Sequence, residues 1–180
     1  KTAGGDINGT DIRGESVLKT SGGDLDLENL MGRIEAHTSG GDIDVSRVEG
    51  LIRVHTSGGD INAEDISANL TGSTSGGEID LESIKGNVDV TTSGGDIKAQ
   101  QITGALTCHI TGGDIEGNGI IGPVDASTSA GDIELELSYD SSIKEYSFNL
   151  ETRSGDIFIS VPKGLPVNVG AEIFGTGTAQ

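Results

Sequence analysis

The chain has 180 residues, of which 30 are glycine, and aromatic residues make up only 3% of it. Its formal net charge of -18 disfavours nucleic acids and anionic membranes as partners and favours cations or basic surfaces. No apolar run approaches the length of a membrane-spanning helix, so we expect no membrane insertion in this segment. Few aromatics and a high net charge are also typical of disordered chains, but a strict repeat argues against disorder here.

A motif of the form TSGGDI, with variations in some copies, returns every 18 residues. The acidic residue of the motif marks eight equally spaced copies, and a ninth copy ends at Asp156 after a longer interval. The eight acids are Asp6, Asp24, Asp42, Asp60, Glu78, Asp96, Asp114 and Asp132. Such a register predicts a coil that stacks on copies of itself, because each coil then contacts only its neighbours. Since residue 1 falls just before a motif copy, we expect a fragment or a mature form of a longer chain.

The coil of residues 42–59 shows how one repeat is built. Apolar residues alternate with polar ones over 43–46 and again over 52–56, which predicts two strands that each bury one face. Val48 lies at a bend between these strands, and Gly50 marks a turn. A Ser-Gly-Gly corner then returns the chain to the next copy, because glycine tolerates unusual backbone angles and close stacking. By the same alternation, the threonine before each corner points inward.

Neighbouring coils are expected to pair as parallel strands about 4.8 Å apart. The sequence therefore predicts an all-β fold, a single-stranded parallel β-helix (β-solenoid) of about nine coils of 18 residues. Parallel crossovers are nearly always right-handed, so we expect a right-handed helix. A left-handed helix stays open as the alternative, because the repeat period also equals three hexapeptides, although the apolar spacing is not a regular six.

Three segments follow one another along the chain. Residues 1–137 hold the regular coils, and residues 138–147 form an insertion loop that contains both tyrosines. Residues 148–180 form the final coil and the C-terminal end, where Phe158 and Phe174 are expected to cover the open end of the solenoid. The insertion breaks the repeat with Tyr139, Asp140, Lys144, Glu145 and Tyr146. This set is too small to define a mechanism, so no enzyme is expected; a polysaccharide-active β-helix enzyme is the less favoured alternative.

These motifs together resemble the bacterial adhesin-type β-strand repeat family, whose SGGDI-type repeats form a domain of unknown function. Copies of TSGGDI lie at 38–43, 56–61 and 92–97 and, with Leu25 in place of the isoleucine, at 20–25, with further variants at 74–79, 128–133 and 153–162. The resemblance covers nearly the whole chain. It implies a right-handed β-helix in an extracytoplasmic, cell-surface location in the cell envelope. It supplies neither a catalytic residue nor an established ligand.

Columns of acidic residues on the outer face of the first strand are the main candidate site. Like charges one coil apart repel by roughly 1 kcal/mol in water, so something must offset the repulsion. One interpretation is that the motif aspartate accepts hydrogen bonds from backbone N–H groups at its turn. The alternative is a Ca²⁺-binding scaffold similar to a β-roll, since Ca²⁺ prefers oxygen ligands. The Ca²⁺ candidates are Asp24, Asp26, Asp42, Asp44, Glu78 and Asp80.

Cysteine and histidine give weaker candidates. The single cysteine, Cys108, excludes an intrachain disulfide and lies at a core phase, which predicts a small buried side chain. His37 and His55 share an outward column with His109, and the first two are expected to stack one coil apart. A tight transition-metal site needs a third ligand, so we interpret these histidines as exposed polar residues.

The sequence therefore predicts a non-enzymatic structural or interaction module, an adhesin-type β-solenoid that presents an acidic face. No cofactor is expected, with Ca²⁺ as the open alternative. The ligand is expected to be a protein or glycan surface rather than nucleic acid. The N-terminal coil has no evident cap and offers unpaired backbone groups, so end-to-end self-association is a further expectation.

Overall fold

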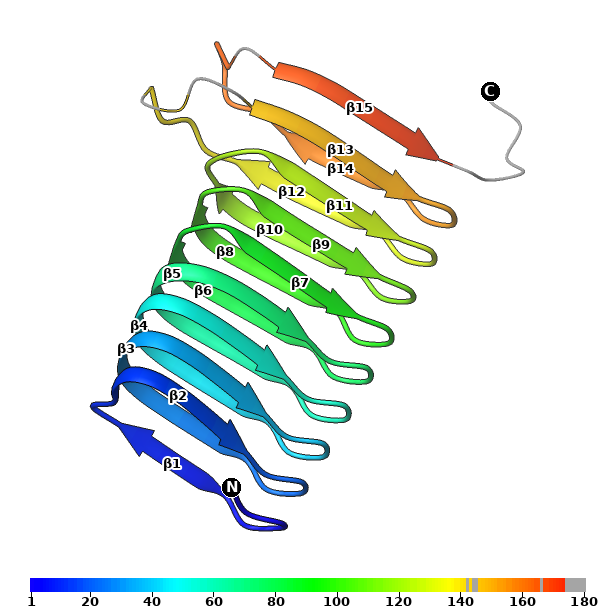
Figure 1. The fold of residues 1–180 in the computed structure, drawn as a ribbon. Coiled ribbons are helices and arrows are strands. Elements are labelled where there is room, and N and C mark those ends of the chain that lie inside the picture. Colours follow the sequence, from blue (N-terminus) through cyan, green and yellow to red (C-terminus); the bar gives the residue numbers. More distant parts are fainter. Residues whose placement is uncertain (142, 144–145, 166, 174–180) are drawn as a thin grey trace.

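A computed structural model of the chain describes residues 1–141, 143, 146–165 and 167–173 (Figure 1). In this part of the chain every regular element is a β-strand, and none of it forms a helix long and apolar enough to cross a membrane. The strands are β1 (Ile7–Thr10), β2 (Arg13–Lys19), β3 (Leu25–His37), β4 (Ile43–His55), β5 (Ile61–Ser73), β6 (Ile79–Lys85), β7 (Val88–Thr92), β8 (Ile97–Thr103), β9 (Leu106–Ile110), β10 (Ile115–Ile120), β11 (Val124–Thr128), β12 (Ile133–Leu137), β13 (Tyr146–Thr152), β14 (Ile157–Ser160) and β15 (Val167–Ile173).

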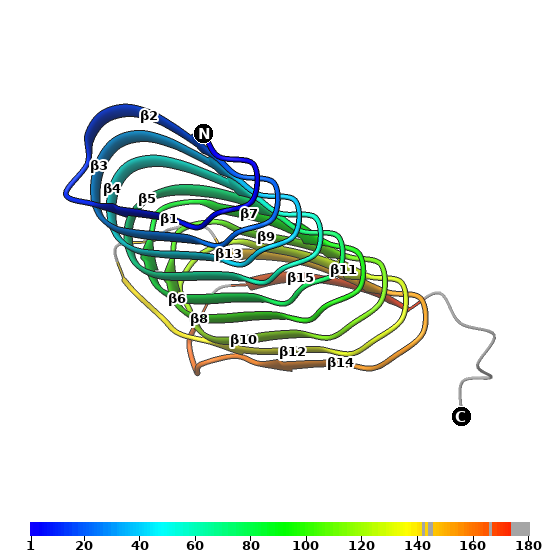
Figure 2. The ribbon, with the colours of Figure 1, turned by 90° about the horizontal axis from the view of Figure 1, so that it is seen from below.

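The chain winds into a flattened coil whose two long sides form two layers of stacked strands (Figures 1 and 2). The first layer consists of β1, β6, β8, β10, β12, β14 and the N-terminal halves of β3, β4 and β5. The second layer consists of β2, β7, β9, β11, β13, β15 and the C-terminal halves of the same three long strands. Both views show the coil winding as a right-handed helix, as predicted.

Each strand pairs in parallel with the equivalent residues of the next coil. Ile43 pairs with Ile61 and His55 with Ser73, so β4 and β5 keep the repeat spacing over their whole length. The predicted parallel β-solenoid is therefore confirmed. About seven regular turns are present rather than nine, because the coils at the two ends depart from the pattern. The strand β1 is short, and the insertion lengthens the step from β11 to β13, where Val124 pairs with Phe148.

Apolar ladders that run along the axis between the two layers form the core. From Leu25 to Ile133 the position after the motif acid is buried, as the alternation predicts. Its members Leu25, Ile43, Ile61, Ile79, Ile97 and Ile133 are all 0% exposed. Stacking removes their apolar surface from water, which stabilises the fold by roughly 25 cal/mol per Å² of surface buried. Cys108 lies in a neighbouring ladder and is fully buried as predicted, and this burial raises the pKa of its thiol.

The threonine of each motif also points inward, and it connects successive corners. The Thr56 hydroxyl donates a hydrogen bond to the Gly41 carbonyl of the preceding coil at 2.8 Å and accepts one from the Gly59 N–H at 3.3 Å. Since Gly41 and Gly59 are buried, the threonine satisfies backbone polarity that would otherwise be costly. The same two bonds recur at Thr20, Thr38, Thr74 and Thr92.

A bend with left-handed backbone angles carries the chain from the first layer to the second. The bend residue precedes an inward apolar residue, as Arg47 precedes Val48, and its φ lies between 54° and 58° in six coils. These residues are Asp11, Asn29, Arg47, Asp65, Ser83 and Gln101. A non-glycine residue in this region costs on the order of 1–3 kcal/mol, so the stacked neighbours must hold the bend in place. In the following coil Gly119 takes the position with a φ of 70°.

Candidate functional site

The motif aspartates of the first layer form a hydrogen-bond ladder along the axis. Asp42 Oδ1 accepts a hydrogen bond from the backbone N–H of Asp60 at 2.8 Å, and Asp60 Oδ1 accepts one from the N–H of Glu78 at 2.7 Å. Equivalent bonds of 2.7–3.0 Å join Asp6 to Asp24, Asp24 to Asp42, Asp96 to Asp114, Asp114 to Asp132 and Asp132 to Asp156. The interpretation that these carboxylates accept backbone hydrogen bonds is confirmed, but the donor belongs to the following coil.

This ladder explains why a column of like charges is compatible with the fold. A hydrogen bond to a charged group contributes about 1.5–3 kcal/mol, which exceeds the repulsion of roughly 1 kcal/mol between carboxylates one coil apart in water. Glu78 carries one more methylene, and its carboxylate forms an ion pair with Lys98 instead. The ladder column is therefore mainly structural. In the columns beyond it, Asp44 accepts a hydrogen bond from Asn62 and Glu28 forms an ion pair with Arg47, whereas Asp26 makes neither with any described residue.

The residues considered for Ca²⁺ divide between these columns. Asp24 and Asp42 belong to the ladder, and each has Oδ1 committed to a backbone amide. Asp26, Asp44 and Asp80 lie two residues after a ladder position, where burial and then neighbouring carboxylates raise the pKa of Asp26 and of Asp80. The carboxylate of Glu78 forms an ion pair with Lys98. Across the described residues no three Asp, Glu, His or Cys side chains form a group that could hold a metal ion.

The outer face of the second layer carries the histidines. The rings of His37 and His55 stack as predicted, with centroids 4.8 Å apart and planes 13° from parallel. Burial, followed by the neighbouring His55, lowers the pKa of His37, so the stack favours the neutral ring. His55 Nδ1 lies 2.7 Å from Ser73 Oγ, and His109, further along the column, makes the same contact with Ser127 at 2.8 Å.

The two tyrosines of the insertion differ in their burial. Tyr146 begins β13 and is 4% exposed. Its hydroxyl accepts a hydrogen bond from the N–H of Asp140 at 2.9 Å and donates one to the Asp140 carbonyl at 3.2 Å. Tyr139 is exposed, while Lys144 and Glu145 lie outside the described residues. Tyr146 thus joins the core and ties the insertion to it.

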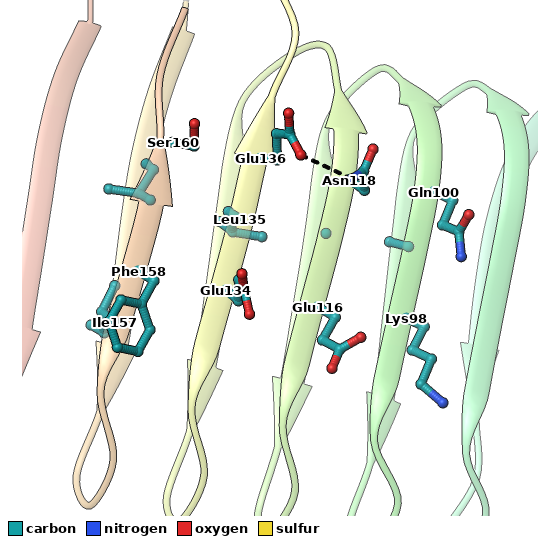
Figure 3. Close-up of a pocket in the computed structure, with 13 residues that line it drawn as sticks. Lys98, Gln100, Glu116, Asn118, Glu134, Leu135, Glu136, Ile157, Phe158 and Ser160 are labelled. Atoms are coloured by element: carbon teal, nitrogen blue, oxygen red, sulfur yellow. Dashed lines mark hydrogen bonds between the residues drawn. The ribbon is translucent and has the colours of Figure 1, made fainter.

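The outer face of the first layer is hollowed in two places. Towards the N-terminus, a hollow of about 370 Å³ lies over β3, β4 and β5 and includes Asp26, Asp44 and Glu64. Towards the C-terminus, a larger groove of about 940 Å³ crosses β8, β10, β12 and β14 (Figure 3). We call it the β8–β14 groove.

The outward side chains of the β8–β14 groove form two rows that follow the strand register. The first row is Lys98, Glu116, Glu134 and Phe158, and the second is Gln100, Asn118, Glu136 and Ser160. Glu136 Oε2 accepts a hydrogen bond from Asn118 Nδ2 at 3.0 Å (Figure 3). The groove therefore brings carboxylates, amides and an aromatic ring together on rigid strands.

Sequence reasoning missed this groove and placed Phe158 wrongly. Phe158 does not cover the open end of the solenoid: it points outward on the first layer and is 57% exposed. Counting two residues on from Asp156 would have placed it in the same outward column as Glu134. Phe174, the other aromatic expected to cover that end, lies outside the described residues.

A single chain stacked as parallel coils defines the protein as a β-solenoid. Residues 18–168 match the family described as Toastrack DUF4097; the match covers more than half of the chain, so the chain belongs to this family. Comparison with curated proteins and with solved structures gave no match. The family description supports a β-solenoid domain without an assigned function, and it does not extend to the adhesin role that the resemblance implied.

Proposed function

We propose that this protein is a non-enzymatic interaction module, a rigid β-solenoid that presents the acidic outer face of its first layer to a cationic partner. The observation that supports this proposal best is that the acidic columns differ in their contacts. The motif aspartates are engaged in the ladder, whereas the outward residues two and four positions further on face solvent over the two hollows. These two columns carry exposed carboxylates, interrupted by neutral residues such as Asn62 and by Lys98, and the carboxylates remain for a partner.

Electrostatics favours a basic partner for this face. Carboxylates one coil apart repel one another by roughly 1 kcal/mol per pair in water, and a bound cation relieves that repulsion. The chain's net charge of -18 also steers positively charged surfaces towards it and speeds their association. In line with the resemblance, we propose an adhesin-type role at the cell surface, where the partner is a basic protein surface or a glycan that carries amino groups.

Immobilised poly-L-lysine is a suitable probe for this proposal. Neutralising Asp26, Asp44 and Glu64 together, as D26N/D44N/E64Q, should weaken binding about tenfold at moderate salt, since each exposed ion pair contributes about 0.2–1 kcal/mol. The matched control D89N/D125N/E151Q removes the same charge from the second layer and should change affinity less than threefold by the same reasoning. Equal losses in the two variants would mean that only net charge matters and would overturn the proposed face.

We also propose end-to-end association through the N-terminal coil. Among the described strands, β1 and β2 pair only with β3, so their outer edges are unpaired, and such edges add further strands readily. Ile7, Ile12 and Leu18 are only partly buried there, whereas their counterparts in the next coil, Leu25, Leu30 and Ala36, are buried. Residues 1–19 also hold three basic and three acidic side chains. The side chains of this end therefore carry no net charge, and it lacks the electrostatic repulsion expected between the acidic coils that follow. Sedimentation velocity should show mass increasing with concentration; a strict monomer at high concentration would refute the association.

A further inference from the structure

The β8–β14 groove has an asymmetric arrangement of charge along its first row (Figure 3). Lys98, at one end, is turned towards Glu78 outside the groove and forms an ion pair with it. Glu116 and Glu134 follow in register on adjacent strands. Phe158 ends the row, in register with Glu134. The middle of the row therefore carries two adjacent carboxylates, and an aromatic ring stands beside the second of them.

The two central carboxylates differ from those acids of the first layer that already have a partner, as Asp26, Glu64 and Glu82 also do. The ladder aspartates are bonded to amides, and Glu136 in the second row accepts a hydrogen bond from Asn118. Glu134, in contrast, makes no hydrogen bond or ion pair with any residue that the structure describes. Glu116 contributes only a longer-range attraction to Lys98. Both carboxylates face the groove with their charge available.

Phe158 gives the groove a second kind of contact. Its ring is 57% exposed on the last strand of the first layer, and it lies within a groove rather than on a flat surface. An aromatic face attracts an ammonium or guanidinium group and also packs against an alkyl chain. A lysine or arginine side chain combines these two features, with an apolar stem and a cationic head.

We propose that the β8–β14 groove is the specific docking site for a lysine or arginine side chain of an extended partner polypeptide. The cationic head lies between the Glu116 and Glu134 carboxylates, and the aliphatic stem and the charge lie against the Phe158 ring. The amides of the second row, Gln100 and Asn118, are placed to bond the partner backbone. This assignment rests on the proposed function and names its partner class.

Charge complementarity favours this occupant over the other ligand classes. An anionic ligand is opposed by Glu116, Glu134 and Glu136 together. A neutral oligosaccharide can use the ring and the amides, but it leaves the two adjacent carboxylates uncompensated. A cationic side chain satisfies both carboxylates and the ring at once.

The experiment measures binding of an acetylated, amidated Gly-Lys-Gly-Lys-Gly peptide to the full chain by isothermal titration calorimetry at low salt. Phe158→Ala should weaken binding about 3- to 30-fold, the range that a cation–π contact supplies. Phe158→Leu keeps an apolar side chain without the ring, so it should weaken binding nearly as much. Glu134→Gln should weaken binding by about threefold or more. Asp89→Asn, which removes one charge from the second layer, should leave affinity within about twofold.

Two further probes complete the test. A peptide with norleucine in place of lysine should not bind, and neither should maltopentaose. Unchanged affinity in both Phe158 variants, or equal losses for Glu134→Gln and Asp89→Asn, would overturn the groove assignment while leaving the broader acidic-face proposal to the poly-lysine result. Binding of maltopentaose that Phe158→Ala abolishes would identify the groove as a sugar site and overturn the peptide assignment.

Discussion

Replacing Gly59 with alanine should destabilise the solenoid by about 3 kcal/mol or more, at the upper end of what overpacking costs. A Cβ at this position would lie 2.1 Å from the Gly41 carbonyl oxygen of the preceding coil and 2.4 Å from its carbon. Both contacts are with backbone, which cannot move aside as a flexible side chain can. The second glycine of the corner is therefore required by the distance between stacked coils, and urea denaturation measures the loss.

The first glycine of the same corner is the matched control. A Cβ on Gly58 would meet its nearest neighbour, the Gly40 carbonyl oxygen, at 3.8 Å, an ordinary contact distance. Gly58→Ala should therefore change stability by no more than about 0.5 kcal/mol, as expected for an exposed position. If the two variants lost the same stability, the close approach of successive corners would not be the reason that the motif contains glycine.

Replacing Thr56 with valine should cost about 1–3 kcal/mol, although the two side chains have almost the same shape. Valine fills the same buried space but leaves the Gly41 carbonyl and the Gly59 N–H without the hydroxyl that bonds them both. These groups are buried, and an unpaired buried polar group loses its full hydration. Thermal and urea denaturation of the variant give the free energy of unfolding.

Two variants test whether the loss of stability comes from the missing hydroxyl of Thr56. Thr56→Ser retains the hydroxyl and loses one methyl, so it should cost only about 1 kcal/mol. Thr71→Val changes an exposed threonine of β5 and should lie within about 0.5 kcal/mol of the wild type. A Thr56→Val protein more stable than Thr56→Ser would contradict the role given to the corner hydroxyl.

The fold follows from the sequence because one period governs every contact. Ile43 recurs as Ile61, Ile79 and Ile97 at equal steps, and in a stacked coil the same step is the spacing between hydrogen-bonded partners. The register of the repeat in the sequence is therefore also the register of strand pairing in the sheet. Burial of the core ladders and the inward direction of Thr56 follow from the alternation of each strand.

The bend between the layers could not be predicted in the same way. Left-handed backbone is usually signalled by glycine or asparagine, yet Arg47, Ser83 and Gln101 adopt it here. Their conformation is imposed by the coils stacked on either side, and local propensity does not report that constraint. Only at Asn29 and Gly119 does the residue type match this signal.

The candidate site was partly predictable. The column of motif acids and its role as a hydrogen-bond acceptor could be inferred from Asp42 and its equivalents. The donor in the next coil could not, because it depends on how far a carboxylate reaches along the stacking axis. The β8–β14 groove was missed for another reason: the longer interval before Asp156 hid the alignment of Phe158 with Glu134.

The ladder also has a consequence for engineering the acidic face. Because each motif aspartate bonds the next coil, neutralising Asp60 would alter stability as well as charge. Variants that test binding should therefore leave the ladder intact and change the outward columns, as the substitutions at Asp26, Asp44 and Glu64 do.

The most direct test of the ladder is a thermal melt of the exhaustively EGTA-treated protein, repeated with millimolar Ca²⁺ and with millimolar Mg²⁺. If the motif aspartates hold backbone amides and the outer columns bind only loose counter-ions, the melting temperature should not change, or should rise equally with both ions. A bound ion at 100 times its Kd stabilises by about 2.7 kcal/mol, so a large rise selective for Ca²⁺ would show that the acidic columns are metal sites and would contradict the ladder as their explanation.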